Sequence, residues 1–306
     1  MNNSEDFFRS RTQGTSRLSA ERISIRTGNG FCTVAGLQDV YCDLFCHRFI
    51  GSGLSLISKK SSNVFLFGRN LFEITITQPT ANQYRNILDF VNMSRKSVFL
   101  WKSKNTKQLL KNELLLCMAL EYYNVRGEQG KPILSEMGSA VHAVKYDHNI
   151  NTSNAAEQLL LKGLSKAFQY MPCINRPFNG YITYVPSYYK SPVKLPQALA
   201  TNLSSIISTS TLLNASLRVE KKQIKTSQLA AKIAEWKRIM NTPGGIECDA
   251  FDTTRDIIII DDVYQSGVSI YSFAEYLHGL GATNIFGLTC VKTWNDDQNP
   301  YAIQRV

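Results

Sequence analysis

Apolar residues in the first part of the chain fall in short runs. Between residues 23 and 78, β-branched or aromatic runs are separated by Gly, Ser and Asn, which is typical of strands joined by turns. These runs are ISIRT, FCTVAG, LSLIS, VFLFG and FEITIT. They predict a β-rich region, which is either a small domain or a sheet that caps the C-terminal part of the chain.

From about residue 106, helical and strand-like patterns alternate. Apolar residues at helical spacing predict helices over 106–124, 153–171, 195–208 and 269–281. Short apolar runs predict strands over 180–186, 256–263 and 284–293. This alternation favours an α/β fold with a doubly wound, mostly parallel sheet. The last two strands are almost continuously apolar, which indicates that both of their faces are covered.

The chain therefore divides into three parts. We expect a frayed polar tail over residues 1–18, a β-rich N-terminal region over 19–105 and an α/β domain over 106–306. The chain has no run of about 18 apolar residues, and its first residues are polar. We therefore expect a cytoplasmic protein without a membrane span or a signal peptide.

One segment combines a buried strand, an acidic turn and a helix. Asp261 and Asp262 come after the apolar run 257–260, at the carboxyl end of the expected strand, where ligands bind in open α/β sheets. The residues that then lead into the next helix are Gln265, Ser266, Gly267, Val268 and Ser269.

The chemistry of this turn suits a phosphorylated sugar. A helix N-terminus presents free N–H groups and the positive end of the helix dipole, and Gly267 would let a phosphate approach the backbone closely. Ser266 and Ser269 add hydroxyl donors, and ionised carboxylates accept hydrogen bonds from sugar hydroxyls. The alternative is a tight turn in which the aspartates only cap the helix. Two adjacent acids after four isoleucines, followed by S-G-x-S, are harder to explain in that way.

The sequence IIIIDDVYQSGVS (257–269) resembles the I/V-I-I-I-D-D-x-x-x-S/T-G-x-S/T signature of type I phosphoribosyltransferases. Gln265 stands where Thr is usual, and Tyr264 is bulky for its position. Shorter elements, in the same order along the chain, resemble the ComF branch of that family, which is linked to bacterial competence. They are Val144-Lys145-Tyr146, Tyr184-Val185-Pro186 followed by Lys190, the group Lys222, Lys225, Thr226 and Gln228, and the pair Arg238 and Asn241.

The resemblance implies a function for residues 106–306 as a phosphoribosyltransferase-like domain. Such a domain binds phosphoribosyl pyrophosphate with Mg²⁺ bridged by ligand oxygens, and transfers phosphoribose to a nitrogen acceptor. Asp261 and Asp262 would bind the ribose hydroxyls and, with Lys225, would be the catalytic residues. The turn 265–269 would hold the 5′-phosphate. The residues placed near pyrophosphate would be Ser187, Tyr188, Lys190, Lys222 and Lys225.

Charge leaves several partners open. The net charge of +10 suits an anionic partner, which would be a phosphorylated small molecule, a nucleic acid or an acidic lipid, but it also fits a soluble basic enzyme. Between Leu217 and Arg238, seven basic residues stand against two acidic ones. This segment would either close over a pyrophosphate or form a solvated basic helix, and both interpretations remain open. Basic residues around VFLW (98–101) would contact single-stranded nucleic acid, or VFLW would be a buried strand followed by the start of an exposed basic helix; we prefer the second interpretation.

Cysteine spacing argues against a zinc module. Cys32, Cys42, Cys46 and His47 gather in the N-terminal region with the spacing C-x₉-C-x₃-C-H. Paired C-x-x-C motifs are missing, and the adjacent Cys46 and His47 would have difficulty in binding one tetrahedral ion. We therefore expect buried, reduced thiols here and no metal site.

The sequence favours two functions and allows a third. The first is a transferase that uses phosphoribosyl pyrophosphate. The second is a non-catalytic sensor of that compound or of a nucleotide, acting in DNA uptake, phage defence or regulation, because one fold serves many functions. A nucleic-acid-binding protein that kept the fold without the ligand is a third, weaker reading. The acceptor base cannot be read from the sequence, and a homodimer or a partner protein are both open.

Overall fold

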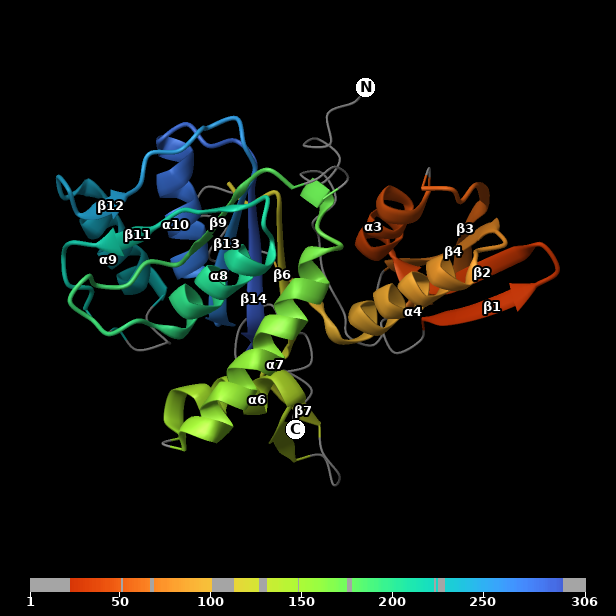
Figure 1. Ribbon diagram of the computed structural model, residues 1–306, viewed down its shortest axis with the longest axis horizontal. Coiled ribbons are helices and arrows are strands. Elements are labelled where there is room, and N and C mark those ends of the chain that lie inside the picture. The colour runs from red at the N-terminus through yellow and green to blue at the C-terminus, as the bar shows by residue number, and fades with distance from the viewer. Residues whose placement is uncertain are drawn as a thin grey trace.

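The structure is a computed structural model, in which the described part of the chain lies between residues 23 and 293. It describes residues 23–50, 52–66, 69–100, 113–126, 131–147, 149–174, 178–222, 224 and 229–293. Two sheets dominate it, a smaller antiparallel one near the N-terminus and a larger, mostly parallel one (Figure 1).

The N-terminal region is a four-stranded antiparallel sheet, as the β-rich pattern predicted. The strand order is β1-β2-β4-β3, and each neighbouring pair is antiparallel. The runs LSLIS and VFLFG both contribute to one long strand, β3. The strands are β1 (Ser24–Gly28), β2 (Phe31–Gln38), β3 (Leu56–Leu66) and β4 (Arg69–Thr77).

Two helices accompany this sheet, and the hydrophobic pattern did not predict them. They are α3 (Asp39–Phe49) and α4 (Ala81–Lys96). A local signal for α4 was present in the sequence, because Thr80 and Gln83 form a capping box at its start. Its buried face then has helical spacing through Ile87, Phe90 and Val91.

The larger sheet confirms the α/β prediction. Its strand order is β10-β9-β13-β14-β6-β5; the first five strands run parallel and β5 is an antiparallel edge. The strands in sheet order are β10 (Thr211–Leu212), β9 (Tyr181–Tyr184), β13 (Ile257–Tyr264), β14 (Ile285–Lys292), β6 (Leu116–Tyr122) and β5 (Val98–Leu100).

The helix predicted over 106–124 is wrong in its second half. Leu116–Tyr122 form β6, in which every residue is buried. A strand covered on both faces is a continuous apolar run, and periodicity alone does not separate such a run from a buried helix. Residues 106–112 of the predicted helix lie outside the described residues.

Helices cover both faces of the larger sheet. Ile258 and Ile260 of β13 face one core, to which α6 (Glu136–Tyr146), α7 (Ile150–Phe168) and α8 (Leu195–Ile206) contribute. Ile257 and Ile259 face the other core, with α9 (Leu229–Asn241) and α10 (Val268–Gly279). This alternation results from the two-residue period of a strand. The remaining elements are β7 (Asn124–Arg126), β8 (Pro132–Leu134), the 3₁₀ turn Pro172–Ile174, β11 (Ala215–Leu217) and β12 (Ile246–Cys248).

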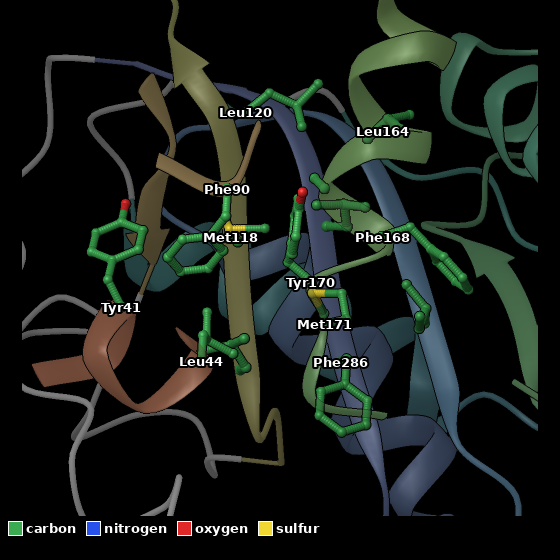
Figure 2. Packing of buried hydrophobic residues seen from close by; sticks show 14 of the residues in the cluster. Tyr41, Leu44, Phe90, Met118, Leu120, Leu164, Phe168, Tyr170, Met171 and Phe286 are labelled. Atoms are coloured by element: carbon green, nitrogen blue, oxygen red, sulfur yellow. The ribbon is translucent and has the colours of Figure 1, made fainter. Parts of the chain in front are cut away.

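The N-terminal sheet shares the first of these cores. The ring centres of Phe90 in α4 and Tyr170 after α7 lie 5.3 Å apart, and those of Phe45 and Phe90 lie 5.6 Å apart. Met118 of β6 belongs to the same cluster, as Figure 2 shows. His47 of α3 adds a polar tie, because its ring Nε2 lies 2.7 Å from the carbonyl oxygen of Pro172. The N-terminal region therefore packs on the larger sheet as a cap.

The cysteines of the described chain are all free thiols, and Cys32, Cys42, Cys117, Cys173 and Cys290 are buried. Within the described residues, no cluster of three or more His, Cys, Asp or Glu side chains has the arrangement of a metal site. None of the helices in that part of the chain has the length and apolar character needed to cross a bilayer.

The basic residues around VFLW are only partly described. Arg95 Nη2 donates to the main-chain oxygen of Ile23 at 2.7 Å, and Lys96 Nζ lies 2.8 Å from Glu136 Oε2. Trp101 and the lysines after it, up to Lys111, lie outside the described residues. Both described basic side chains are thus engaged within the protein.

Candidate functional site

The two adjacent aspartates lie toward the carboxyl end of the central strand, β13. Ile257–Ile260 are fully buried, and β13 is paired in parallel with both β9 and β14. Asp261 and Asp262 are the first residues of β13 that are partly exposed. Gly267 then adopts a left-handed φ of 76° and forms the N-cap of α10. The predicted strand and helix are confirmed, but Asp261 and Asp262 belong to β13, which continues to Tyr264, and the turn consists of residues 265–267.

The two adjacent aspartates have different surroundings. Asp261 lines a cavity on the side of α9 and α10, and its Oδ1 accepts the main-chain N–H of Asp262 at 2.9 Å. The Asp262 side chain belongs to the other face, where its Oδ2 lies 2.7 Å from Lys145 Nζ at the end of α6. Neighbouring side chains on a strand point to opposite faces, which explains the separation.

The cavity lies between the turn and the segment that leads into α9. Its volume is about 370 Å³, which is within the range of small-molecule sites. One wall consists of Asp261, Val263 and Tyr264 from the end of β13, together with Gln265, Ser266, Gly267, Val268 and Ser269 from the turn and the start of α10. The opposite wall consists of Lys221, Lys222, Ile224, Lys232, Glu235 and Trp236. Three lysines thus face the end of β13 and the start of α10.

Burial shifts the pKa values of the ionisable side chains in this cavity. Burial raises the pKa of Asp261 to about 7, and repulsion from Asp262 adds to the rise, while Lys145 and Lys221 oppose it. Burial likewise lowers the pKa of Lys221, against the attraction of Asp261. Burial also lowers the pKa of Lys232. An anionic ligand would favour the charged form of Lys221 and Lys232, so the cavity suits an anion.

Aromatic rings support both walls of the cavity. Lys221 Nζ lies 5.0 Å from the centre of the Trp236 ring, which is a cation–π distance. On the other wall, Lys292 Nζ lies 5.3 Å from the ring centre of Tyr264. Trp236 and Tyr264 are both buried.

The reason for glycine at position 267 differs from the expected one. A Cβ atom at this position would collide with the ring of Tyr264. We expected the missing side chain of Gly267 to leave room for a phosphate, but the Tyr264 ring fills that space. Gly267 is needed because of its positive φ and because Tyr264 packs against it.

The structure brings some of the predicted site residues together and separates others. Asp261, the turn 265–269 and Lys222 line the cavity, and Asp262 does not. Lys225 lies outside the described residues. The remaining three, which lie on the loop after β9 and do not line the cavity, are Ser187, Tyr188 and Lys190.

The loop after β9 still runs along the same edge of the sheet. The main-chain oxygen of Ser187 accepts the main-chain N–H of Leu217 at 2.9 Å, and the main-chain N–H of Tyr189 donates to the main-chain oxygen of Leu217 at 3.0 Å. Lys190 is exposed, with its Nζ 5.5 Å from the ring centre of Tyr189. The loop is therefore tied to β11, and the lysine faces solvent.

Seven residues that line the cavity were not predicted as site residues, and neither was Lys145 beside Asp262. The seven are Lys221, Ile224, Lys232, Glu235, Trp236, Val263 and Tyr264. Lys221 and Lys232 belong to the basic segment noted in the sequence, and Lys232 and Trp236 are four residues apart, which places them on one face of α9. That spacing was a usable signal. Lys145 was noted only as part of the element Val144-Lys145-Tyr146, and its pairing with Asp262 was not predicted because it depends on how α6 lies on the sheet.

No protein-family model matches the chain, and no curated protein does so either. Among solved structures, a purine phosphoribosyltransferase from Pyrococcus horikoshii Ot3 aligns with 45% of this chain and 83% of its own length, at 13% identity and a TM-score of 0.27. The UMP synthase of Leishmania donovani aligns with 60% of this chain and 31% of its own length, at 12% identity and a TM-score of 0.28. These likenesses are too slight to assign a function, so the chemistry of the cavity rests on its own residues.

Proposed function

We propose that the protein binds phosphoribosyl pyrophosphate with Mg²⁺ and transfers the phosphoribosyl group to a nitrogen acceptor. The supporting observation is the cavity in which Lys221, Lys222 and Lys232 face Asp261 and the start of α10. The resemblance of residues 257–269 to the phosphoribosyltransferase signature is the reason for naming this sugar phosphate among phosphorylated ligands.

Each part of the ligand has a matching part of the cavity. The turn 265–269 offers main-chain N–H groups, serine hydroxyls and a helix N-terminus to the 5′-phosphate. Asp261 accepts hydrogen bonds from the ribose hydroxyls when it is ionised. The lysines of the opposite wall attract the pyrophosphate. This orientation brings the sugar between the anion sites, with C1 toward the lysines.

The residues present fit a magnesium ion that arrives with its ligand. Two carboxylates among the described residues line the cavity, Glu235 and Asp261. Glu235 forms an ion pair with Arg238, so Asp261 is the carboxylate that would contact the ion. Mg²⁺ is usually bound by one or two carboxylates together with phosphate oxygens and waters. When bound, the ion would neutralise part of the pyrophosphate charge.

The reaction breaks the bond between C1 and the pyrophosphate oxygen and forms a bond from C1 to the acceptor nitrogen, which releases its proton to water. The electron pair of the broken bond leaves with pyrophosphate. Positive charge placed beforehand at the leaving group lowers the barrier, because it stabilises negative charge as it develops. Lys221, Lys222 and Lys232 supply that charge, and Lys225 stays a prediction for the same role.

The test combines ligand binding with turnover. Calorimetry with phosphoribosyl pyrophosphate and Mg²⁺ should show binding by the wild-type protein, and pyrophosphate release should appear with at least one base of a purine and pyrimidine panel. Asp261→Asn should weaken binding by about tenfold or more, because a hydrogen bond to a charged group is lost. Asp89→Asn is the matched control, since Asp89 forms an exposed ion pair with Lys166 away from the cavity. Equal affinity of wild type and Asp261→Asn would contradict the proposal.

A second candidate is a sensor that binds the same ligand without turnover. The observation that favours it is the pairing of Asp262 with Lys145, which leaves a single aspartate of the acidic pair at the cavity. Tight binding of phosphoribosyl pyrophosphate without release across the panel would support the sensor. Binding of neither this ligand nor a nucleotide, together with a salt-dependent DNA shift, would instead support a nucleic-acid-binding protein.

A further inference from the structure

Glu235 lines the cavity, yet its carboxylate is engaged by the protein itself. The residue lies in α9 and its side chain is 6% exposed. Glu235 Oε1 accepts the main-chain N–H of Lys222 at 2.8 Å and the Arg238 Nη2 at 2.8 Å. Glu235 Oε2 accepts the Arg238 Nε at 2.9 Å. The carboxylate thus joins α9 to the segment that carries the cavity lysines.

Arg238 makes a second tie to the same segment. Its Nη2 also donates to the main-chain oxygen of Glu220 at 3.0 Å. Glu235 and Arg238 together therefore hold residues 220 and 222, and Lys221 stands between these two attachment points. The next residue of α9, Trp236, provides the ring near which Lys221 Nζ lies at 5.0 Å.

The cavity lysines need such support. Lys221, Lys222 and Lys232 carry like charges in one cavity, and burial penalises the charged form of Lys221. A free chain segment would move these ammonium groups into water. A buried carboxylate with hydrogen bonds from an arginine and from a main-chain N–H is a stronger attachment than an exposed ion pair on a helix.

We propose that Glu235 and Arg238 are positioning residues, which hold Lys221 and Lys222 in the cavity for the pyrophosphate part of the ligand. This inference rests on the proposed function. It differs from a purely structural role for the pair, because it requires that the loss of Glu235 act on the ligand through the lysines.

The test uses inorganic pyrophosphate with Mg²⁺ as the probe, in calorimetry on the full chain. Glu235→Gln keeps the size of the side chain and removes the charge that binds Arg238. It should weaken pyrophosphate binding by about tenfold, the order expected for losing charge-assisted hydrogen bonds. Arg238→Lys keeps the positive charge but loses the bidentate contact with Glu235, so it should also weaken pyrophosphate binding. This variant replaces Glu235→Gln in the test if Glu235→Gln does not fold. Glu220→Gln is the matched control, because Arg238 contacts only the main chain of Glu220.

A double-mutant cycle separates positioning from a general loss of structure. Lys222→Gln should weaken pyrophosphate binding in the wild-type background and have a much smaller effect in the Glu235→Gln background, since the lysine is no longer held there. If the effects of Lys222→Gln and Glu235→Gln on pyrophosphate affinity are additive, or if Glu235→Gln leaves the affinity unchanged, this inference is wrong. The proposed function would still stand in that case, because the wild-type protein binds the ligand. No binding of pyrophosphate or of phosphoribosyl pyrophosphate by the wild type would overturn both.

Discussion

Lys145 Nζ lies 2.7 Å from Asp262 Oδ2, on the face of the sheet that α6 covers, whereas the preceding Asp261 lines the cavity on the other face. Both side chains of the ion pair are largely buried, at 30% exposure for Lys145 and 16% for Asp262. Two acids that are adjacent in sequence therefore have separate roles. Asp261 is available to a ligand, and Asp262 connects the end of β13 to α6.

The first prediction concerns this division. Asp261→Asn should weaken the binding of phosphoribosyl pyrophosphate by about tenfold or more, because a charged acceptor is lost at the cavity. Asp262→Asn should change affinity less and should lower the free energy of unfolding instead. Calorimetry and urea unfolding on both variants provide the measurement. Equal losses of affinity in the two variants would contradict separate roles.

The second prediction concerns the ion pair itself. Lys145→Gln should lower the free energy of unfolding by about 1–2 kcal/mol, because Asp262 is left partly buried without its charged partner. Lys166→Gln is the control. It breaks the exposed pair with Asp89 and should cost well under about 1 kcal/mol. A loss in Lys145→Gln no larger than in the control would show that the pair does not stabilise the turn.

The third prediction concerns pH. Because the pKa of Asp261 is raised to about 7 in the folded protein, the folded state holds a proton that the unfolded state releases near pH 4, at about the ordinary aspartate value. The contribution of this group to stability is complete below that ordinary value and is lost as pH rises through 7. Urea unfolding between pH 5 and 8 should therefore show a steeper fall for wild type than for Asp261→Asn. Parallel curves would argue against a raised pKa at Asp261.

The fourth prediction concerns Gly267. Gly267→Ala should lower the free energy of unfolding by about 2–4 kcal/mol, because the left-handed backbone becomes strained and the new methyl meets the Tyr264 ring. Gly279→Ala is the control in the same helix, since a Cβ there meets no atom within 4 Å. It should be neutral or stabilising by up to about 1 kcal/mol. Similar losses in the two variants would contradict the packing of Tyr264 against Gly267.

The parts of the fold that the sequence predicted are those that depend on local pattern. The strand, acidic turn and helix of residues 257–281 were found because burial, charge and capping change there within a few residues. β6 was mistaken for a helix, because a strand buried at all seven positions has no alternation to reveal it. The capping box of Thr80 and Gln83 is a local sequence signal for the start of α4, which the hydrophobic pattern alone does not reveal.

The parts of the site that were missed depend on packing between distant segments. Lys145 reaches Asp262 only because α6 lies across the sheet at the right place. The ring of Tyr264 fills the space beside Gly267, and its size was noted in the sequence while its direction was unknown. Similarly, the contact of Glu235 with the main chain of Lys222 depends on how α9 is placed against the preceding segment. Side-chain direction and helix placement depend on packing between distant segments, which the local pattern of a single sequence does not reveal.

The most direct measurement is a crystal structure of the protein with phosphoribosyl pyrophosphate and Mg²⁺. We predict the 5′-phosphate on the main-chain N–H groups of residues 265–269, a ribose hydroxyl within hydrogen-bond distance of Asp261, and pyrophosphate beside Lys221 and Lys222. A ligand bound away from this cavity, or one whose sugar makes no contact with Asp261, would contradict the proposed site.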